Sequence, residues 1–252
     1  MALTEPVLRT TGLSKSFGGL HAVDNVDFEL IAGRLHAIIG PNGAGKTTFF
    51  NLITGLLTPD AGQVTFLGRD ITGMKPHQIS RLGLARTLQV KSVFDGLSVY
   101  DNVWIAAHSR LGFLHPLRSA ASYRSTANKV ERLLDQLRLQ GSRDELAGNL
   151  SYGDVALLEF AIALATEPKL LLLDEPVAGM SQSETQNTVK LVKELSKSVN
   201  IILIEHDMEV VFDTADIITV MNQGAILCQG TPDLIARDMR VQEAYLGSPE
   251  EP

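Results

Sequence analysis

The stretch Gly40-Pro41-Asn42-Gly43-Ala44-Gly45-Lys46-Thr47 decides the fold of this chain, because its glycine spacing and terminal Lys-Thr pair form a nucleotide phosphate loop. An apolar run at residues 35–39 precedes it as a buried strand, and residues 47–53 follow it as a helix. That order of elements is the one such a loop requires. A glycine-rich turn with an incidental lysine is the competing interpretation, and these flanks disfavour it. We therefore expect nucleotide binding.

The chemistry of the loop follows from its shape. Glycines allow successive backbone N–H groups to converge on a phosphate, and the start of the following helix adds about half a positive charge there. Lys46 brings a cation to the β- and γ-phosphates, and the Thr47 hydroxyl is placed to bind Mg²⁺. The loop positions expected to bind the nucleotide are Asn42, Gly43, Ala44, Gly45, Lys46, Thr47 and Thr48.

Composition limits the partners and the compartment. The 252 residues carry a formal charge of −7, which argues against a nucleic-acid surface, and 44% hydrophobic residues support a sizeable core. The single cysteine, Cys228, cannot form an internal disulfide and fits a reducing compartment as a buried thiol. Residues 1–11 lack the apolar core of a signal peptide, and no apolar stretch reaches the ~18 residues needed to cross a bilayer. We expect a protein that reaches a membrane only through a partner.

Hydrophobic patterning divides the chain into parts of one α/β domain, residues 1–252. Apolar and polar residues alternate at 26–30 and 63–67, which predicts antiparallel strands there, and the pattern at 76–164 favours helices. Two buried strands are expected at 170–173 and 201–204. Between them we expect a helix at 183–197, capped by Ser181 or Ser183. A hairpin at 217–221 and 225–229 precedes a helix opened by Thr231. We expect a mainly parallel core sheet with an antiparallel β-subdomain in residues 1–85 and 166–247, a helical subdomain in residues 86–165, and a tail at 248–252.

Two carboxylates follow an apolar strand at Asp174 and Glu175, where ligands collect in parallel sheets. Asp174 is expected to hold Mg²⁺ through water, and Glu175 to polarise the water that attacks the γ-phosphate. The competing interpretation is that acidic residues simply end a strand. Because the same chain contains a phosphate loop, we favour the catalytic interpretation of these two carboxylates.

Two further positions are candidates for phosphate contacts. His206 follows the strand at 201–204, so its imidazole is expected to reach the γ-phosphate, although a lone histidine is commonly a structural group. Ser151 precedes the apolar helix at 155–165, so it and the loop N–H groups form a second anion site, directed at the nucleotide of a neighbouring copy. The alternative for Ser151 is a simple helix N-cap.

Four features follow one another along the chain: the phosphate loop, the segment Leu150-Ser151-Tyr152-Gly153, which we call the signature segment, the pair Asp174-Glu175, and His206. Together they resemble an ABC ATPase cassette over residues 7 to about 247. The resemblance implies a P-loop NTPase fold that hydrolyses ATP with Mg²⁺, with Ser151 and Gly153 contacting ATP across a cassette dimer. It implies that Gln89 touches Mg²⁺ and the attacking water and links the site to a membrane partner. It also implies that Phe17 stacks on adenine. From the residues alone, Gln89 and Phe17 are an ordinary polar residue and an ordinary aromatic.

In more detail, the chain resembles the branched-chain amino acid importer subfamily at four places, residues 17–20, 85–89, 150–153 and 244–247. That resemblance implies a second cassette, identical or paralogous, transmembrane permease subunits, a solute-binding protein and a position on the cytoplasmic face of the cell membrane. We expect no nucleic-acid partner, because of the formal charge of −7. A soluble ABC-type ATPase acting as a nucleotide-gated switch is the alternative from a different functional class. A subunit that binds ATP but hydrolyses little is a third possibility.

The signature departs from the family pattern after Gly153. Asp154, Ala156 and Leu157 stand where the family has glutamine and basic residues, Ile162 stands where an arginine is common, and Ser181 replaces a frequent aspartate. Asp154 adds a negative charge beside the expected γ-phosphate position, although the first helical turn favours an acidic residue. The departure predicts a weakened signature.

Overall fold

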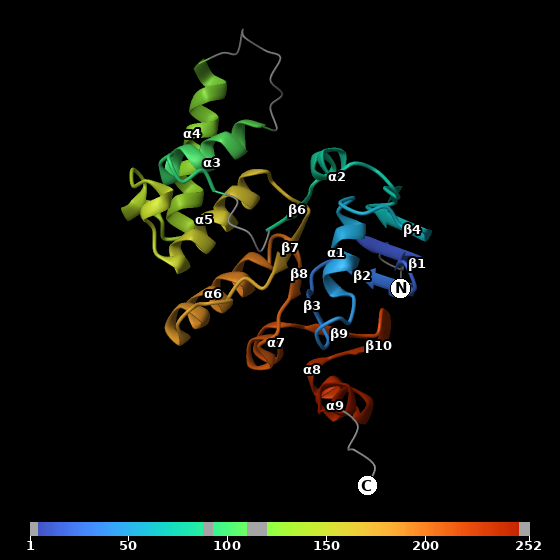
Figure 1. Ribbon diagram of the computed structural model, residues 1–252. Coiled ribbons are helices and arrows are strands. Elements are labelled where there is room, and N and C mark those ends of the chain that lie inside the picture. The colour runs from blue at the N-terminus through green and yellow to red at the C-terminus, as the bar shows by residue number, and fades with distance from the viewer. Residues whose placement is uncertain (1–4, 88–92, 110–119, 247–252) are drawn as a thin grey trace.

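The core of the fold is a mainly parallel sheet with strand order β10-β9-β3-β8-β7-β6 (Figure 1). The computed structural model describes residues 5–87, 93–109 and 120–246. Only β10 runs antiparallel to its neighbour among the paired strands of this sheet in those ranges. The strands are β3 (Leu35–Ile39), β6 (Leu84–Arg86), β7 (Leu170–Asp174), β8 (Asn200–Ile204), β9 (Ile217–Asn222) and β10 (Ala225–Gly230).

Both faces of this sheet are covered, which explains the continuous apolar runs of its strands. Alternate residues of one strand enter different hydrophobic clusters: Leu171 and Leu173 pack into one, and Leu170 and Leu172 into the other. Every residue of β3 and β7 is buried. Burial on both sides fixes where these strands end, and so where the residues after them lie.

A second, antiparallel sheet has the order β2-β1-β4-β5 and forms the expected β-subdomain. Val26, Phe28 and Leu30 are buried while the residues between them are exposed, so the predicted period of two is confirmed. The end of the first strand brings Phe17 to the phosphate loop side of the molecule. The strands are β1 (Leu8–Phe17), β2 (Leu20–Leu30), β4 (Ala61–Phe66) and β5 (Arg69–Asp70).

Helices flank the core sheet, and α3, α4 and α5 gather at the end away from the antiparallel sheet (Figure 1). Ser181 caps α6 in a capping box with Glu184, as one of the two predicted caps. None of the helices in the described ranges has the length and hydropathy to span a membrane. The α-helices are α1 (Lys46–Ile53), α2 (Pro76–Leu82), α3 (Val99–Ser109), α4 (Ala120–Gln136), α5 (Tyr152–Ala165), α6 (Gln182–Leu195), α7 (Met208–Thr214), α8 (Pro232–Arg237) and α9 (Met239–Leu246). The 3-10 helices in the described part of the chain are η1 (Gln140–Ser142) and η2 (Ala147–Asn149).

One part of the helical prediction for residues 76–164 is wrong. Leu84–Arg86 form β6, which pairs in parallel with β7, Leu84 opposite Leu170 and Arg86 opposite Leu172. Three residues are too few to show a strand's period of two, so the sheet partner decides their conformation. The expected subdomain boundary between residues 85 and 86 falls inside this strand, and Arg86 lies in the core sheet.

Candidate nucleotide site

The carboxyl ends of three neighbouring strands bring the predicted chemistry together. β3 leads into the phosphate loop, β7 ends at Asp174, and β8 leads into Glu205 and His206. Beside these ends lies an open pocket of about 800 Å³, a size suited to a small organic ligand. It is lined by Phe17, Gly19, Leu20, His21, Ala22, residues 42–48, Glu175, His206 and Gln223.

Two glycines give the phosphate loop its path. Gly40 has φ 154°, and a Cβ there would lie 2.1 Å from the Met221 carbonyl oxygen. Gly45 has φ 98°, and its Cβ would lie 2.2 Å from the Ala22 carbonyl oxygen. Both positions therefore require glycine. Gly45 is also the N-cap of α1 and provides no side-chain cap, so the first-turn N–H groups of α1 are left for an anion.

Lys46 is folded back onto the loop that carries it. Its Nζ donates hydrogen bonds to the carbonyl oxygens of Gly40 (2.6 Å) and Pro41 (3.0 Å), and the residue is 6% exposed. Burial lowers the pKa of Lys46, while the charges of Glu175 and Asp174 act to raise it. The ammonium is therefore held by two backbone carbonyls at the pocket wall, where the charges of two carboxylates act on it.

Asp174 divides its two oxygens between different tasks. Arg86 Nη2 donates to Asp174 Oδ2 at 2.6 Å, whereas the buried Oδ1 has no hydrogen-bond partner among the described residues. A buried oxygen without a partner is costly unless a ligand satisfies it. Hard cations such as Mg²⁺ take oxygen ligands, so Asp174 Oδ1 and the Thr47 hydroxyl are a chemically suitable pair.

Glu175 and His206 form a contact at the pocket wall. His206 Nε2 lies 2.6 Å from Glu175 Oε1, and both side chains are partly exposed. Glu175 has φ 52°, an unfavourable conformation for a residue with a side chain, and such residues cluster at functional sites. The pair therefore lies in the same pocket as the phosphate loop.

Sequence reasoning missed Glu205. It is 4% exposed, and its two carboxylate oxygens accept hydrogen bonds from Val177 N and His206 N, each at 3.1 Å. Burial raises the pKa of Glu205. The side chain thus joins the segment after β7 to the segment after β8. The sequence signal for Glu205 as a site residue is its acidic side chain directly before His206, at the end of a strand.

The signature segment lies apart from this pocket. Ser151 is the N-cap of α5, as its structural interpretation predicted: its Oγ accepts from Asp154 N at 3.1 Å and donates to Asp154 Oδ2 at 2.7 Å. Neither Ser151 nor Gly153 lines the 800 Å³ pocket. Their contact with a nucleotide of another copy stays a prediction. Gln89 lies outside the described residues.

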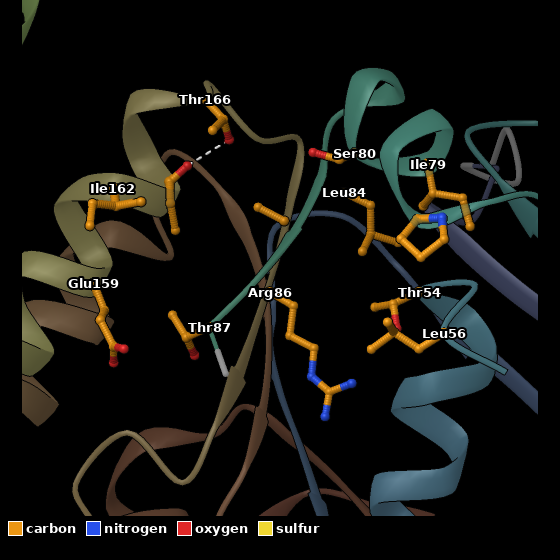
Figure 2. A pocket seen from close by; sticks show the side chains of 13 residues that line it. Thr54, Leu56, Ile79, Ser80, Leu84, Arg86, Thr87, Glu159, Ile162 and Thr166 are labelled. Atoms are coloured by element: carbon orange, nitrogen blue, oxygen red, sulfur yellow. Dashed lines mark hydrogen bonds between the residues drawn. The ribbon is translucent and has the colours of Figure 1, made fainter. Parts of the chain in front are cut away.

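A second pocket, of about 350 Å³, lies between α2, β6 and α5 (Figure 2). We call it the groove. Its walls are largely aliphatic, and Leu56 at its rim is 53% exposed. Arg86 and Thr87, the last residues described before position 93, also line it. The lining residues are Thr54, Leu56, Pro76, Ile79, Ser80, Leu84, Ala85, Arg86, Thr87, Glu159, Ile162, Ala163 and Thr166.

Comparisons with known proteins agree with this geometry. Residues 23–178 match the ABC transporter family. The chain is 40% identical to LivG, a high-affinity branched-chain amino acid transport ATP-binding protein of Salmonella typhimurium, over 97% of this chain and 99% of LivG. It is 37% identical to BraF of Pseudomonas aeruginosa, which has the same description, again over 97% and 99%. A solved ATP-binding cassette of an ABC transporter, in its ADP conformation, superposes with a TM-score of 0.84 at 32% identity over 97% of this chain and 100% of that one.

Proposed function

Since the chain belongs to the ABC transporter family, we propose that it binds and hydrolyses ATP to drive import of branched-chain amino acids or a related small solute through separate permease subunits. The observation that carries the proposal is the single pocket shared by Phe17, the phosphate loop, Glu175 and His206. The transport descriptions of LivG and BraF disfavour the soluble switch.

The residues of the pocket divide the work on ATP. Phe17, 48% exposed at the pocket wall, offers its ring to adenine. Residues 42–48 hold the phosphates through N–H groups at the start of α1, and Lys46 exchanges the Gly40 and Pro41 carbonyls for β- and γ-phosphate oxygens. A divalent cation held by Thr47, Asp174 and Gln89 would neutralise charge that develops on the phosphates.

Glu175 and His206 act at the γ-phosphate end. Glu175 accepts a proton from the attacking water, and His206, 2.6 Å from its carboxylate, holds both the carboxylate and the γ-phosphate in place. Glu205 fixes the backbone on both sides of this pair. The chain's own atoms therefore supply orientation and a proton acceptor, and the fixed dipoles of the loop supply most of the electrostatic stabilisation.

The working unit in this proposal is a pair of cassettes, identical or paralogous, on the cytoplasmic side of permeases, with a solute-binding protein delivering the solute. Ser151 and Gly153 lie outside their own chain's pocket, which supports a role toward the ATP of the second cassette. The proposal is tested with the complex purified from native membranes and placed in vesicles. Uptake of labelled leucine that requires ATP is expected, and ATP turnover without any uptake of leucine, isoleucine or valine would exclude branched-chain amino acids as the solute.

Asp154 is expected to restrain this activity, because it accepts the Ser151 hydroxyl hydrogen that a phosphate would otherwise accept. We predict that Asp154→Asn raises ATP turnover of the complex roughly 3- to 10-fold, since removing one partly exposed charge is a change of about 1 kcal/mol. Steady-state phosphate release measures it. Ser151→Ala combined with Asp154→Asn is the matched control and should erase the gain. Equal or slower turnover in Asp154→Asn alone would show that the carboxylate does not restrain Ser151.

The groove is the proposed contact surface for the permease. Its aliphatic walls suit an apolar segment of a partner, and the chain passes from its lining residue Thr87 into the segment that contains Gln89.

We predict that Leu56→Glu releases the cassette from permease-containing membranes while ATP binding stays within about two-fold, because a charge would be buried in an apolar contact. Co-sedimentation with membranes measures this. Leu234→Glu, at a leucine of α8 that is 65% exposed, is the control and should remain bound; release of both variants or of neither would exclude the groove.

A further inference from the structure

Arg86 joins three elements around the proposed metal site. Its Nη1 donates to Asn51 Oδ1 of α1 at 2.6 Å, and its Nη2 donates to Asp174 Oδ2 of β7 at 2.6 Å. The guanidinium carbon lies 5.3 Å from the centre of the Phe50 ring. The side chain extends from β6 alongside α1 (Figure 2). One residue therefore ties the helix after the phosphate loop to the carboxylate at the end of β7.

The contact is buried and sharply directional. The side chains of Arg86 and Asp174 are 8% and 1% exposed. A planar guanidinium donates along fixed directions, so two hydrogen bonds to different acceptors determine its orientation. Asp174 Oδ2 is consequently committed to Arg86, and Oδ1 is left as the buried oxygen without a partner among the described residues. A carboxylate free to rotate would not keep this division.

We propose that Arg86 is a positioning residue for the divalent cation: it holds Asp174 Oδ2 so that Oδ1 alone is presented to the metal, in register with α1 and the phosphate loop. The inference rests on the proposed function, because it assumes that ATP enters with a cation. Residues that orient a metal ligand commonly change metal affinity 10- to 100-fold when replaced, although they do not touch the metal. Arg86 meets that description through geometry, not through charge alone.

The test is Mn²⁺ affinity in the presence of a non-hydrolysable ATP analogue, measured from the electron paramagnetic resonance signal of free Mn²⁺. Arg86→Met is expected to weaken Mn²⁺ binding by about 10- to 100-fold. Binding of the analogue without metal, in EDTA, is expected to stay within two-fold of the unaltered chain. Arg81→Met, at an exposed arginine of α2, is the matched control and should leave both measurements unchanged.

Arg86→Lys keeps the test decisive if Arg86→Met fails to fold. Lysine retains a positive charge beside Asp174 but cannot donate in the forked geometry that reaches both Asn51 and Asp174. Its Mn²⁺ affinity is expected to fall at least about three-fold, an intermediate loss. Unchanged or higher Mn²⁺ affinity in the folded Arg86 variants would overturn the positioning role. Absence of any analogue binding by the unaltered chain would instead overturn the proposed function.

Discussion

Glu175→Gln is expected to lower ATP turnover about 10²- to 10⁴-fold, or about 3 to 5 kcal/mol of activation free energy, while ATP binding persists. The amide keeps the size of the side chain and its contact with His206, but it does not accept the proton of the attacking water. Glu175 already lines the pocket, and its Oε1 lies 2.6 Å from His206 Nε2. The fall in ATP turnover is therefore expected without any rearrangement of the site.

Single-turnover hydrolysis with excess cassette complex, beside a nucleotide-binding titration, separates chemistry from binding. Glu243→Gln, at an exposed glutamate of α9, is the control and should turn over ATP normally. Turnover within about three-fold of the unaltered complex would remove Glu175 from the proton-accepting role. Loss of ATP binding along with turnover would mean that the substitution disturbs the pocket and not the chemical step.

Lys46→Ala is expected to reduce both binding and turnover, because Lys46 meets the phosphates in the ground state and in the transition state. A charge-assisted hydrogen bond contributes about 1.5 to 3 kcal/mol, which corresponds to a roughly 10- to 100-fold weaker affinity for ATP. The substitution also leaves the Gly40 and Pro41 carbonyl oxygens without the ammonium they accept from. Turnover should fall by at least as much as affinity.

Titration with a fluorescent ATP analogue measures the affinity, and phosphate release measures the turnover. Lys197→Ala, at an exposed lysine after α6, serves as the control because it removes the same charge at a residue that does not line the pocket. If Lys46→Ala bound ATP as tightly as the control, the ammonium would have to remain on its loop carbonyls when nucleotide is present.

The parts of this fold that sequence predicts well are those in which one local pattern determines both structure and chemistry. The sequence predicts residues 35–39 as a strand with the observed bounds, and it predicts the end of the strand at Asp174 to within one residue. Buried parallel strands are continuous apolar runs, and the glycines of the phosphate loop have a spacing that few other turns share. The ends of such strands then place Lys46, Asp174, Glu175 and His206 at one edge of the sheet.

What sequence did not predict depends on contacts between distant segments. β6 is a strand because β7 offers it a partner, and Arg86 reaches Asp174 across 88 positions of the chain. The sequence does not distinguish Glu205 from other acidic residues, because its role depends on a hydrogen bond from Val177 N, 28 positions away. The roles proposed for Ser151, Gly153 and Gln89 remain predictions, because they involve a second cassette, a nucleotide or residues outside the described ranges.

The Glu205 carboxylate has a mechanical consequence. Because it accepts hydrogen bonds from the backbone on both the Glu175 side and the His206 side, it links these two segments. We therefore expect the Glu175 carboxylate and the His206 imidazole to move together if either segment shifts relative to α1. A link of this kind would keep the 2.6 Å contact between the two side chains whenever the pocket opens or closes.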